Sequence, residues 1–407
     1  MSDLTPTSGK ALRVAIVNRS DSRGGAAVVS YRLMKALRDI GVDARMLVAD
    51  RTTDDANVAL AGTKIGRRAA FLAERLKIFL NNGFNRADLF KVDIANVGVD
   101  FMSHKWIQDA DVVCLNWVNQ GFVSLDTVGR LAKAGKKIVW TMHDMWNAVG
   151  VCHHAAECRR YLADCSDCSF TRLAPKVFEK KRSIYADADI TFVAVSRWLA
   201  ERCRESALLA DADVRVIPNA FPIDDFSFER VGDTAPTVIF GAARLDDAVK
   251  GLDVAIDALN IVARRRPEVR AIFFGDIRQP QLLDRLEMPH EHLGRISLDA
   301  ARETYRKADV VLSTSLYETL PGTIVEGMAA GCVPVAFDSG GQTDIFDHDR
   351  TGFVADYLNA ESVADCVINA IDRKISRQTL HDEVARRFSA QSVAQKYLAI
   401  FTEKMTK

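Results

Sequence analysis

This chain of 407 residues has neither an excess of one charge nor a long apolar run, and both absences are informative. Lysine plus arginine and aspartate plus glutamate number 54 each, which argues against wholesale binding to nucleic acid. No apolar stretch approaches a membrane span, and residues 1–10 form a polar lead without the apolar segment of a secretory signal. We therefore expect a cytoplasmic protein, and the length favours two domains over one core.

Cysteine is sparse, and the eight residues show no disulfide framework. Four of them fall within seventeen residues: Cys152, Cys158, Cys165 and Cys168. Four thiolates can close a tetrahedral zinc site, and the last pair has suitable spacing. Because the other gaps are irregular, the sequence leaves open a structural zinc or reduced thiols packed in a loop, with disulfides as a third interpretation that a reducing cytoplasm disfavours. No pattern indicates a catalytic metal.

The two glycine-rich fingerprints of phosphate sites are also missing, because the chain has no Gly-x-Gly-x-x-Gly and no P-loop ending. A shorter pair, Gly24 and Gly25, follows the first predicted strand and opens a helix predicted over 26–40. The missing side chains would let a diphosphate or an acceptor approach the helix N-terminus. An ordinary tight connection explains the pair equally well.

What the sequence does contain is an alternation of short β-branched runs with helical patterns, which predicts parallel sheets covered on both faces. The alternation occurs twice, on either side of the turn-rich residues 218–236. The first series of runs covers 12–17, 44–48, 111–115, 137–141, 190–195 and 214–217, and the second covers 237–241, 270–274, 309–312 and 332–337. We therefore predict an α/β protein with two doubly wound domains facing a central cleft, where ligands of such folds usually bind.

Two glutamates stand eight residues apart, directly after an apolar run of the second series. Glu318 lies on a loop that ends in the turn residues Pro321 and Gly322, and Glu326 lies in a helix that opens near Thr323. Such a helix aims free backbone N–H groups at an anion, which is the arrangement of a sugar-nucleotide site. In that interpretation Glu318 reaches sugar hydroxyls and Glu326 accepts from a ribose diol. Alternatively, Glu326 only stabilises the helix dipole.

Further polar residues follow other predicted strands. Arg244 and Lys250 stand on a strand-to-helix loop of the second series, where two cations can neutralise a diphosphate, unless they are solvated surface residues. His143 and Asp144 follow a strand of the first series. Asp144 could orient the imidazole of His143, which could bind a sugar hydroxyl or move a proton. A purely structural histidine is the alternative.

Taken together, these features resemble one family, the family-four retaining glycosyltransferases of the GT-B fold. The resemblance covers nearly the whole chain and is most specific over 308–354, the nucleotide-sugar half of that family. His143-Asp-Met-Trp146 followed by Cys152-His-His154 resembles more narrowly the colanic-acid-type exopolysaccharide transferases. The loop Thr319-Leu-Pro321 departs from the more common Gly-Phe-Pro type, which leaves the donor sugar open.

The resemblance implies roles for the residues singled out above. It implies an acceptor-side Rossmann-like domain over 1–220, a nucleotide-sugar domain over 221–387, and a last helix of about 388–407 that packs back on the first domain. The implied catalytic residues are His143, Arg244, Lys250 and Glu318, and the implied ligand-binding residues are Gly24, Gly25, Arg295, Ile296, Leu320, Pro321, Gly322, Thr323 and Glu326.

The implied function is a retaining, metal-independent hexosyltransferase. It would move a sugar from a nucleoside-diphosphate sugar to a saccharide or lipid-linked saccharide acceptor in exopolysaccharide or cell-surface glycan synthesis. The departing phosphate would accept the acceptor's proton, so positioning and electrostatics would carry the rate without a protein nucleophile. The alternatives are a GT-B epimerase or phosphorylase and a non-catalytic sugar-nucleotide-binding scaffold.

One further segment indicates a partner. Residues 60–92 are basic, and Phe71, Leu72, Leu76, Phe79 and Leu80 recur there at helical spacing. Such a helix could rest peripherally on an anionic membrane at its inner face. The alternative is an amphipathic helix packed on its own domain.

Overall fold

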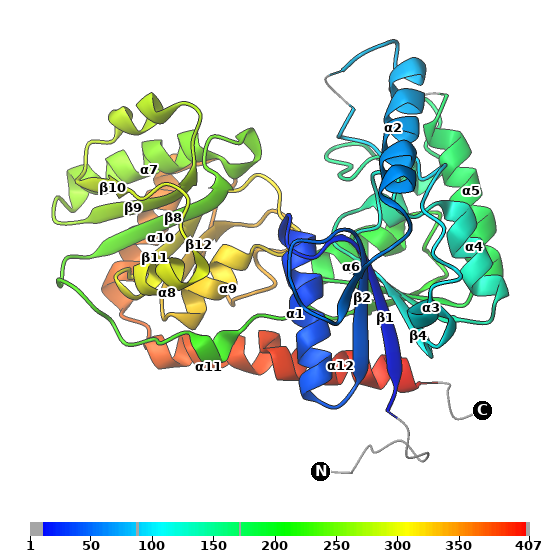
Figure 1. Ribbon diagram of the computed structural model, residues 1–407. Helices are drawn as coiled ribbons and strands as arrows, with labels where there is room; N and C mark the ends of the chain where they lie inside the picture. Colours follow the sequence, from blue (N-terminus) through cyan, green and yellow to red (C-terminus); the bar gives the residue numbers. More distant parts are fainter. Residues whose placement is uncertain (1–10, 87–88, 171, 404–407) are drawn as a thin grey trace. The chain divides into compact units, whose positions relative to one another are not determined.

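The computed structural model describes residues 11–86, 89–170 and 172–403. The polar lead 1–10 and the last four residues of the predicted C-terminal helix therefore lie outside the described residues. The chain divides into two compact units, which we call unit 1 (residues 1–220 and 393–407) and unit 2 (residues 221–392) (Figure 1).

Unit 1 is built on a seven-stranded parallel sheet in the order β3-β2-β1-β4-β5-β6-β7. Its strands are β1 (Arg13–Ser20), β2 (Asp43–Asp50), β3 (Val58–Leu60), β4 (Val112–Leu115), β5 (Lys137–Met142), β6 (Ile190–Ala194) and β7 (Asp213–Val216). Its main helices are α1 (Gly25–Asp39), α2 (Lys64–Asn81), α3 (Lys105–Gln108), α4 (Leu125–Lys133), α5 (Ala174–Asp187) and α6 (Arg197–Glu205). The strand order reverses between β1 and β4, the place where doubly wound sheets bind ligands.

The β-branched runs form the strands because both faces of the sheet are covered. Ile16, Leu47, Val113 and Val139 are fully buried, as expected for central strands of a parallel sheet. Most of the last helix, α12 (Ala390–Thr402), also belongs to unit 1. There the Tyr397 hydroxyl lies 2.9 Å from the Thr141 hydroxyl at the end of β5.

Unit 2 repeats the architecture with a six-stranded parallel sheet in the order β10-β9-β8-β11-β12-β13. Its strands are β8 (Thr237–Arg244), β9 (Arg270–Asp276), β10 (His290–His292), β11 (Val310–Ser313), β12 (Val333–Phe337) and β13 (Phe353–Ala355). Its helices include α7 (Leu252–Arg265), α8 (Leu298–Arg306), α9 (Gly322–Ala329), α10 (Ala360–Arg373) and α11 (Arg377–Phe388). The predicted pair of doubly wound parallel sheets is confirmed.

The sequence pattern did not predict three of the strands, β3, β10 and β13, each of which has three residues. A run that short carries too little periodicity to stand out, and all three strands lie at sheet edges. Among the described residues, no helix combines the length and the apolar character that crossing a membrane requires.

Candidate functional site

The carboxyl edge of the unit 2 sheet brings two of the predicted site residues into direct contact. Lys250, at the end of a 3₁₀ turn after β8, forms an ion pair with the Glu318 carboxylate after β11. The Ser315 hydroxyl lies 3.4 Å from the same carboxylate oxygen. Lys250 and Glu318 are 68 residues apart in sequence, so the parallel packing of β8 against β11 is what joins them.

Gly251 allows the Lys250 loop to pack closely against the residues after β11. Its φ is +66°, and a Cβ there would lie 2.1 Å from the Thr314 carbonyl oxygen. The Thr314 hydroxyl donates to the Gly251 carbonyl at 2.9 Å, and the Leu316 N–H donates to the Val249 carbonyl at 2.7 Å. Only glycine fits this approach, because any side chain would meet backbone.

Gly340 and Gln342 hold the Glu318 loop from the other side. Gly340 has φ +77°, and a Cβ there would lie 1.9 Å from the Glu318 carbonyl oxygen, which accepts from the Gly341 N–H at 2.7 Å. The buried Gln342 amide donates to the Ser315 carbonyl at 3.0 Å. Sequence reasoning used these residues only as part of a resemblance and missed that they position Glu318.

Arg244 is also held by acidic neighbours. Its guanidinium donates to the Asp247 carboxylate at 2.9 Å and lies 3.6 Å from Asp246. Both predicted phosphate-binding cations thus have a carboxylate partner within unit 2. They remain accessible, because the Arg244 and Lys250 side chains are 36% and 27% exposed.

The remaining predicted residues of unit 2 lie on α9 and on the loop after β10. Leu320 and Pro321 are buried before α9, whose start has no side-chain cap and no acidic residue in its first turn. Glu326 is half-buried within α9, as are Gly322 and Thr323 at its start. Arg295 is exposed and pairs with Asp276, while Ile296 is half-buried. An uncapped helix start leaves N–H groups able to bind an anion.

In unit 1, Gly24 and Gly25 begin α1 directly after the β1 loop. Gly24 is the N-cap with φ +93°, a conformation that favours glycine, and neither glycine has another atom within 4 Å of an added Cβ. The first turn of α1 contains no acidic residue and no side-chain cap. The geometry therefore leaves room for a ligand at Gly24 and Gly25.

His143 follows β5 and is positioned by a residue that the sequence interpretation did not name. Its Nε2 lies 3.1 Å from the Asn116 side-chain oxygen, at the end of the neighbouring strand β4. Burial lowers the pKa of His143 to about 4, so the ring is neutral at neutral pH. The Asp144 carboxylate binds other groups, and its charge opposes the lowering of the His143 pKa, so its part in orienting this ring stays a prediction.

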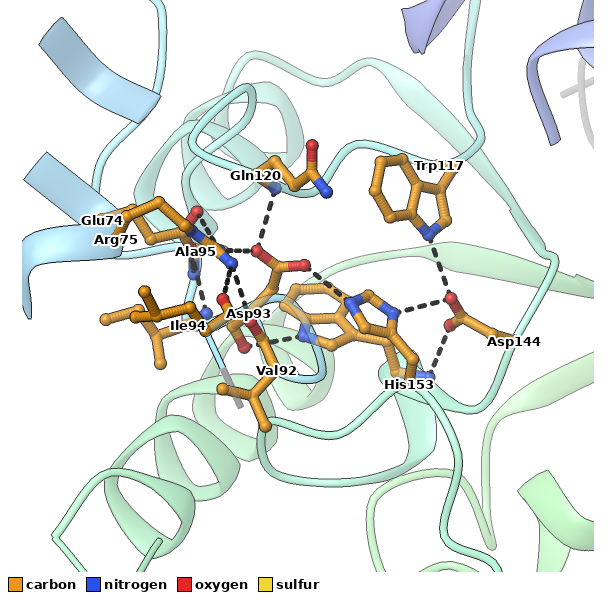
Figure 2. A network of polar contacts seen from close by, with 12 residues as sticks. Glu74, Arg75, Val92, Asp93, Ile94, Ala95, Trp117, Gln120, Asp144 and His153 are labelled. Atoms are coloured by element: carbon orange, nitrogen blue, oxygen red, sulfur yellow. Dashed lines mark hydrogen bonds and ion pairs between the residues drawn. The ribbon is translucent and has the colours of Figure 1, made fainter. Parts of the chain in front are cut away.

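Figure 2 shows the polar contacts of the Asp144 carboxylate. It accepts from the Trp117 indole at 3.0 Å and from the Trp146 N–H at 2.8 Å, and it lies 2.7 Å from His153 Nδ1. The other ring nitrogen of His153 lies 2.6 Å from Asp93. Although burial opposes protonation, the carboxylates of Asp144 and Asp93 raise the pKa of His153 to about 10.

The network continues from Asp93 into helix α2. Asp93 forms an ion pair with Arg75, which also pairs with Glu74 at 3.0 Å. Glu74 accepts from the backbone N–H of Ile94 at 3.0 Å. Burial, followed by the Asp93 charge, raises the pKa of Glu74. Five charged side chains therefore connect α2, the loop after it and the segment after β5.

The four-cysteine segment lies beside this network but forms no recognisable metal site. Over 11–86, 89–170 and 172–403, no three histidine, cysteine or acidic side chains are grouped so that they could hold a metal ion. Cys152, Cys158, Cys165 and Cys168 are free thiols, and burial raises the pKa of Cys152 to about 12. The Cys158, Cys165 and Cys168 thiols lie near enough to raise the pKa of Cys152 further, so structural zinc and packed thiols both stay predictions for this segment.

Comparison with known proteins identifies the class. A family model described as "Glycosyltransferase Family 4" matches residues 23–225, and one described as "Glycosyl transferases group 1" matches residues 236–373. Solved structures show the same fold over nearly the whole chain. The Anabaena protein HepE, crystallised with UDP and glucose, covers 96% of this chain and 99% of its own at 17% identity, with a TM-score of 0.62.

A second structure, sucrose-phosphate synthase from Thermosynechococcus elongatus, covers 97% of this chain and 99% of its own at 15% identity, with a TM-score of 0.64. These likenesses establish the GT-B fold, two Rossmann-like units in one chain. With the two family matches, they show that the chain belongs to the glycosyltransferases, with family 4 matched in unit 1.

Among curated proteins, the matches have higher sequence identity but cover only part of the chain. The gpi3 subunit of phosphatidylinositol N-acetylglucosaminyltransferase from Schizosaccharomyces pombe is 25% identical over 217 residues, which is 49% of this chain and 46% of that protein. The phosphatidyl-myo-inositol mannosyltransferase of Mycobacterium tuberculosis is 29% identical over 224 residues, 51% of this chain and 58% of that protein. The chain thus spans about half the length of these relatives.

Proposed function

We propose that this protein is a retaining glycosyltransferase that moves a sugar from a nucleoside-diphosphate sugar to a saccharide or lipid-linked acceptor in cell-surface glycan synthesis. The observation that carries the proposal is the contact of Lys250 with Glu318 beside Arg244, at the carboxyl edge of the unit 2 sheet. Two cations, an acidic side chain and an uncapped helix start within one unit match the chemistry of a sugar diphosphate.

The donor would use these groups in separate tasks. Arg244 and Lys250 would neutralise the diphosphate as it leaves, Glu318 would bind sugar hydroxyls, and Glu326 the ribose. HepE was solved with UDP and glucose, which supports a nucleotide-sugar donor for a chain of the same fold. In a same-face displacement the leaving phosphate oxygen takes the acceptor's proton, so the configuration is retained without a protein nucleophile.

The ion pairs of unit 2 would exchange partners when the donor binds. Lys250 and Arg244 have carboxylate partners, and both cations are partly exposed. A diphosphate carries more charge than one carboxylate and can replace it as the partner of a cation. Glu318, released from Lys250, would then be available to the sugar hydroxyls.

A lipid-linked acceptor is favoured by the surface of α2. Ile65 is 83% exposed, and Leu72, Leu76 and Leu80 are half exposed along the same helix. The exposed cations Lys64, Arg68 and Lys77 accompany them. The opposite side of α2 holds Glu74 and Arg75 in the network, so Arg75 is not part of the basic surface.

We infer that α2 rests on an anionic membrane, with its apolar side chains in the headgroup region and its cations on the lipid charges. Both relatives are named for phosphatidylinositol, a membrane lipid, and this supports a lipid-linked acceptor for the present chain. The narrower resemblance to exopolysaccharide transferases stays a prediction.

The first test is thermal stabilisation by a panel of nucleoside diphosphates and their sugars. A ligand present at 100 times its Kd stabilises the native protein by about 2.7 kcal/mol, so one nucleotide should raise the Tm. The Arg244→Ala variant should lose the shift. Arg264→Ala is the matched control, because Arg264 is an exposed arginine of the same unit that pairs with Glu287. No shift with any nucleotide would contradict the proposal.

The second test measures transfer from the nucleotide sugar so identified. Glu318→Ala should lower kcat by about 10²-fold or more through lost sugar positioning, while the Tm changes little because the side chain is not deeply buried. Transfer should persist in EDTA and yield the retained anomer, as followed by NMR of the product. Product formed without any acceptor would indicate an epimerase or hydrolase instead.

Membrane contact is tested by co-sedimentation with vesicles at low salt. The protein should sediment with phosphatidylglycerol vesicles and not with pure phosphatidylcholine, and Leu72→Glu with Leu76→Glu should abolish sedimentation. Leu358→Glu is the matched control, because Leu358 is 51% exposed in unit 2. Equal sedimentation of all variants would disprove the role of α2.

A further inference from the structure

The Asp246 carboxylate, two residues after Arg244, uses only one of its two oxygens. Its Oδ2 accepts from the backbone N–H of Arg278 at 2.8 Å and from that of Gln279 at 3.0 Å. Its Oδ1 is buried and accepts no hydrogen bond from any residue that the structure describes. The side chain as a whole is only 3% exposed. A buried carboxylate oxygen without a donor costs free energy, so it calls for an explanation.

The nearest donor for this oxygen is Nε of Arg244, which is in the same state. Nε is buried and, within the described part of the chain, has no hydrogen-bond partner. It lies 3.6 Å from Asp246 Oδ1, just beyond the range of a hydrogen bond. Nη2 of the same guanidinium donates to the Asp247 carboxylate at 2.9 Å. The Arg244 guanidinium therefore sits against Asp247 and stops short of Asp246.

The two neighbouring carboxylates differ in their access to solvent. The Asp247 side chain is 42% exposed, whereas that of Asp246 is 3% exposed. Water screens the attraction of Arg244 to Asp247, but it screens the attraction to a buried carboxylate much less. An anion that arrives from solvent therefore replaces Asp247 more easily than Asp246 as a partner of Arg244.

The backbone at the end of β8 fixes the place of Asp246. The pairing of β8 with β9 is irregular between Gly241 and Arg244, and Arg244 is then paired with Asp276. Such an irregularity at a strand end changes the direction of the side chain that follows it. The Leu245 N–H donates to the Asp276 carbonyl at 2.8 Å, and Asp246 continues the connection by binding the next loop through Oδ2.

We propose that Asp246 is a positioning residue that receives the Arg244 guanidinium when a diphosphate displaces Asp247. Closing the gap from 3.6 Å to about 2.8 Å would satisfy both buried atoms with one charge-assisted hydrogen bond. Neither carboxylate contact involves Nη1, so the outer end of the guanidinium is left for phosphate oxygens. This inference rests on the proposed function, because it takes Arg244 to bind the donor diphosphate.

The proposal gives two adjacent acidic residues opposite roles. Asp246 holds Arg244 in the bound state, so it favours binding of the diphosphate. Asp247 holds Arg244 only in the free state, so it competes with the diphosphate. One substitution, aspartate to asparagine, should therefore change the affinity in opposite directions at the two positions.

The main variant is Asp246→Asn. Asparagine keeps an oxygen for the two backbone N–H groups, but it places an NH₂ donor where Oδ1 was, facing Nε of Arg244. The Kd of a nucleoside diphosphate should rise about tenfold or more, the scale of a lost hydrogen bond to a charged group. Isothermal titration calorimetry with UDP, GDP, ADP and dTDP measures the Kd against that of the wild type.

The matched variant is Asp247→Asn. Asp247 also accepts from the Val249 N–H at 3.3 Å, and asparagine caps a helical turn about as well as aspartate does. Loss of the competing charge should lower the Kd about two- to fivefold, the scale of an exposed ion pair. A rise in Kd equal to that of Asp246→Asn would overturn the inference, because the two carboxylates would then have the same role.

Amide hydrogen exchange separates positioning of Arg244 from anchoring of the loop. The backbone N–H groups of Arg278 and Gln279 should exchange as slowly in Asp246→Asn as in the wild type, whereas Asp246→Ala should speed their exchange and also weaken binding. Faster exchange of these two amides in Asp246→Asn, together with the loss of affinity, would show that Asp246 acts through the loop. That result would overturn the role assigned to Oδ1.

The hydrogen bond itself can be followed by ¹H–¹⁵N NMR of the arginine side chains. The Arg244 Nε–H signal, assigned by its loss in Arg244→Lys, should move downfield and exchange more slowly when the wild type binds a nucleoside diphosphate. Asp246→Asn should lose this response to the ligand. A signal that responds equally in the wild type and in Asp246→Asn would contradict the proposed contact.

The inference and the proposed function fail in different ways. If the wild type binds none of the four nucleoside diphosphates, the proposed function is overturned, and the inference falls with it. If the wild type binds one of them and Arg244→Ala does not, but Asp246→Asn binds it with an unchanged Kd, only the role of Asp246 is overturned.

Discussion

The charged clusters of the two units differ in burial. In unit 1, the side chains of Glu74, Asp93 and Arg75 are at most 7% exposed and satisfy one another. In unit 2, Arg244 and Lys250 are several times more exposed, at 36% and 27%. The same fold thus carries a sealed set of charges in unit 1 and an open set in unit 2.

The difference indicates different roles. Removing one partner of a buried (sealed) ion pair leaves an uncompensated charge in a medium of low dielectric. Loss of any one member of the buried cluster is therefore expected to destabilise the fold strongly. A partly exposed ion pair contributes little to stability and can exchange its partner for a ligand. We therefore expect stability effects in unit 1 and binding effects in unit 2.

The largest effect should follow Asp93→Ala. The substitution leaves the Arg75 guanidinium and the His153 imidazolium without their shared carboxylate, which costs about 3–5 kcal/mol. All five tryptophans lie in unit 1, so urea unfolding followed by tryptophan fluorescence reports on that unit. Asp100→Ala is the control, because its pair with Arg130 is exposed. Equal losses in both variants would remove the contrast between sealed and open charges.

An intermediate effect should appear as a pH dependence of unit 1. His143 has a folded pKa of about 4, below its ordinary value, so the unfolded state binds a proton first as pH falls. Stability should therefore decrease between about pH 6.5 and pH 4, by about 1.4 kcal/mol per pH unit at most. His143→Gln should flatten this part of the fluorescence-detected profile. An identical slope in both proteins would show that other groups cause it.

The smallest effect should follow Arg265→Ala in unit 2. Arg265 pairs with Glu361 at 2.5 Å and Asp365 at 2.6 Å across α7 and α10, but all three side chains are exposed. Solvent screening limits the loss of stability to about 1 kcal/mol or less. Thermal unfolding followed by circular dichroism measures it, and the remaining shift should shrink further in high salt. A loss as large as that of Asp93→Ala would show that exposure does not separate the two units.

Much of the fold could be predicted from the sequence because the long strands are continuous β-branched runs. The helical spacing of apolar residues over 252–265 also predicts a helix, and it coincides with α7, where Ala255, Ile256, Leu259 and Val262 are all buried. The helix predicted over 26–40 differs from α1 by one residue at each end. Such elements are encoded locally, by spacing and by breakers such as Gly251.

The candidate site was predictable only where its residues follow a strand directly. Lys250 and Glu318 could each be placed at a sheet edge from sequence, but their mutual contact could not. Asp144 was expected to orient His143, but the sequence did not show that the Asn116 side chain of the neighbouring strand lies beside the ring. Consecutive residues of an extended strand point to opposite sides, so a sequence neighbour is a poor guide to the partner of a strand-end side chain.

Helix α2 shows the same limit. Its apolar residues recur at helical spacing, but the sequence did not separate those that face the unit from those that face solvent. Ile78 is fully buried, whereas Leu72, Leu76 and Leu80 are about half exposed, and Arg75 is buried among carboxylates. The apolar pattern of a helix predicts its periodicity, but it does not predict which side of the helix packs against the rest of the unit.

The sequence by itself determined the two parallel sheets, their helices and the strand ends that carry polar residues, because these depend on periodicity and local backbone preference. Only the tertiary structure decided that His153 joins Asp93 to Asp144 and that Asn116 faces His143. These contacts join residues up to 60 positions apart, and they depend on how loops and strand registers pack, which no local pattern encodes.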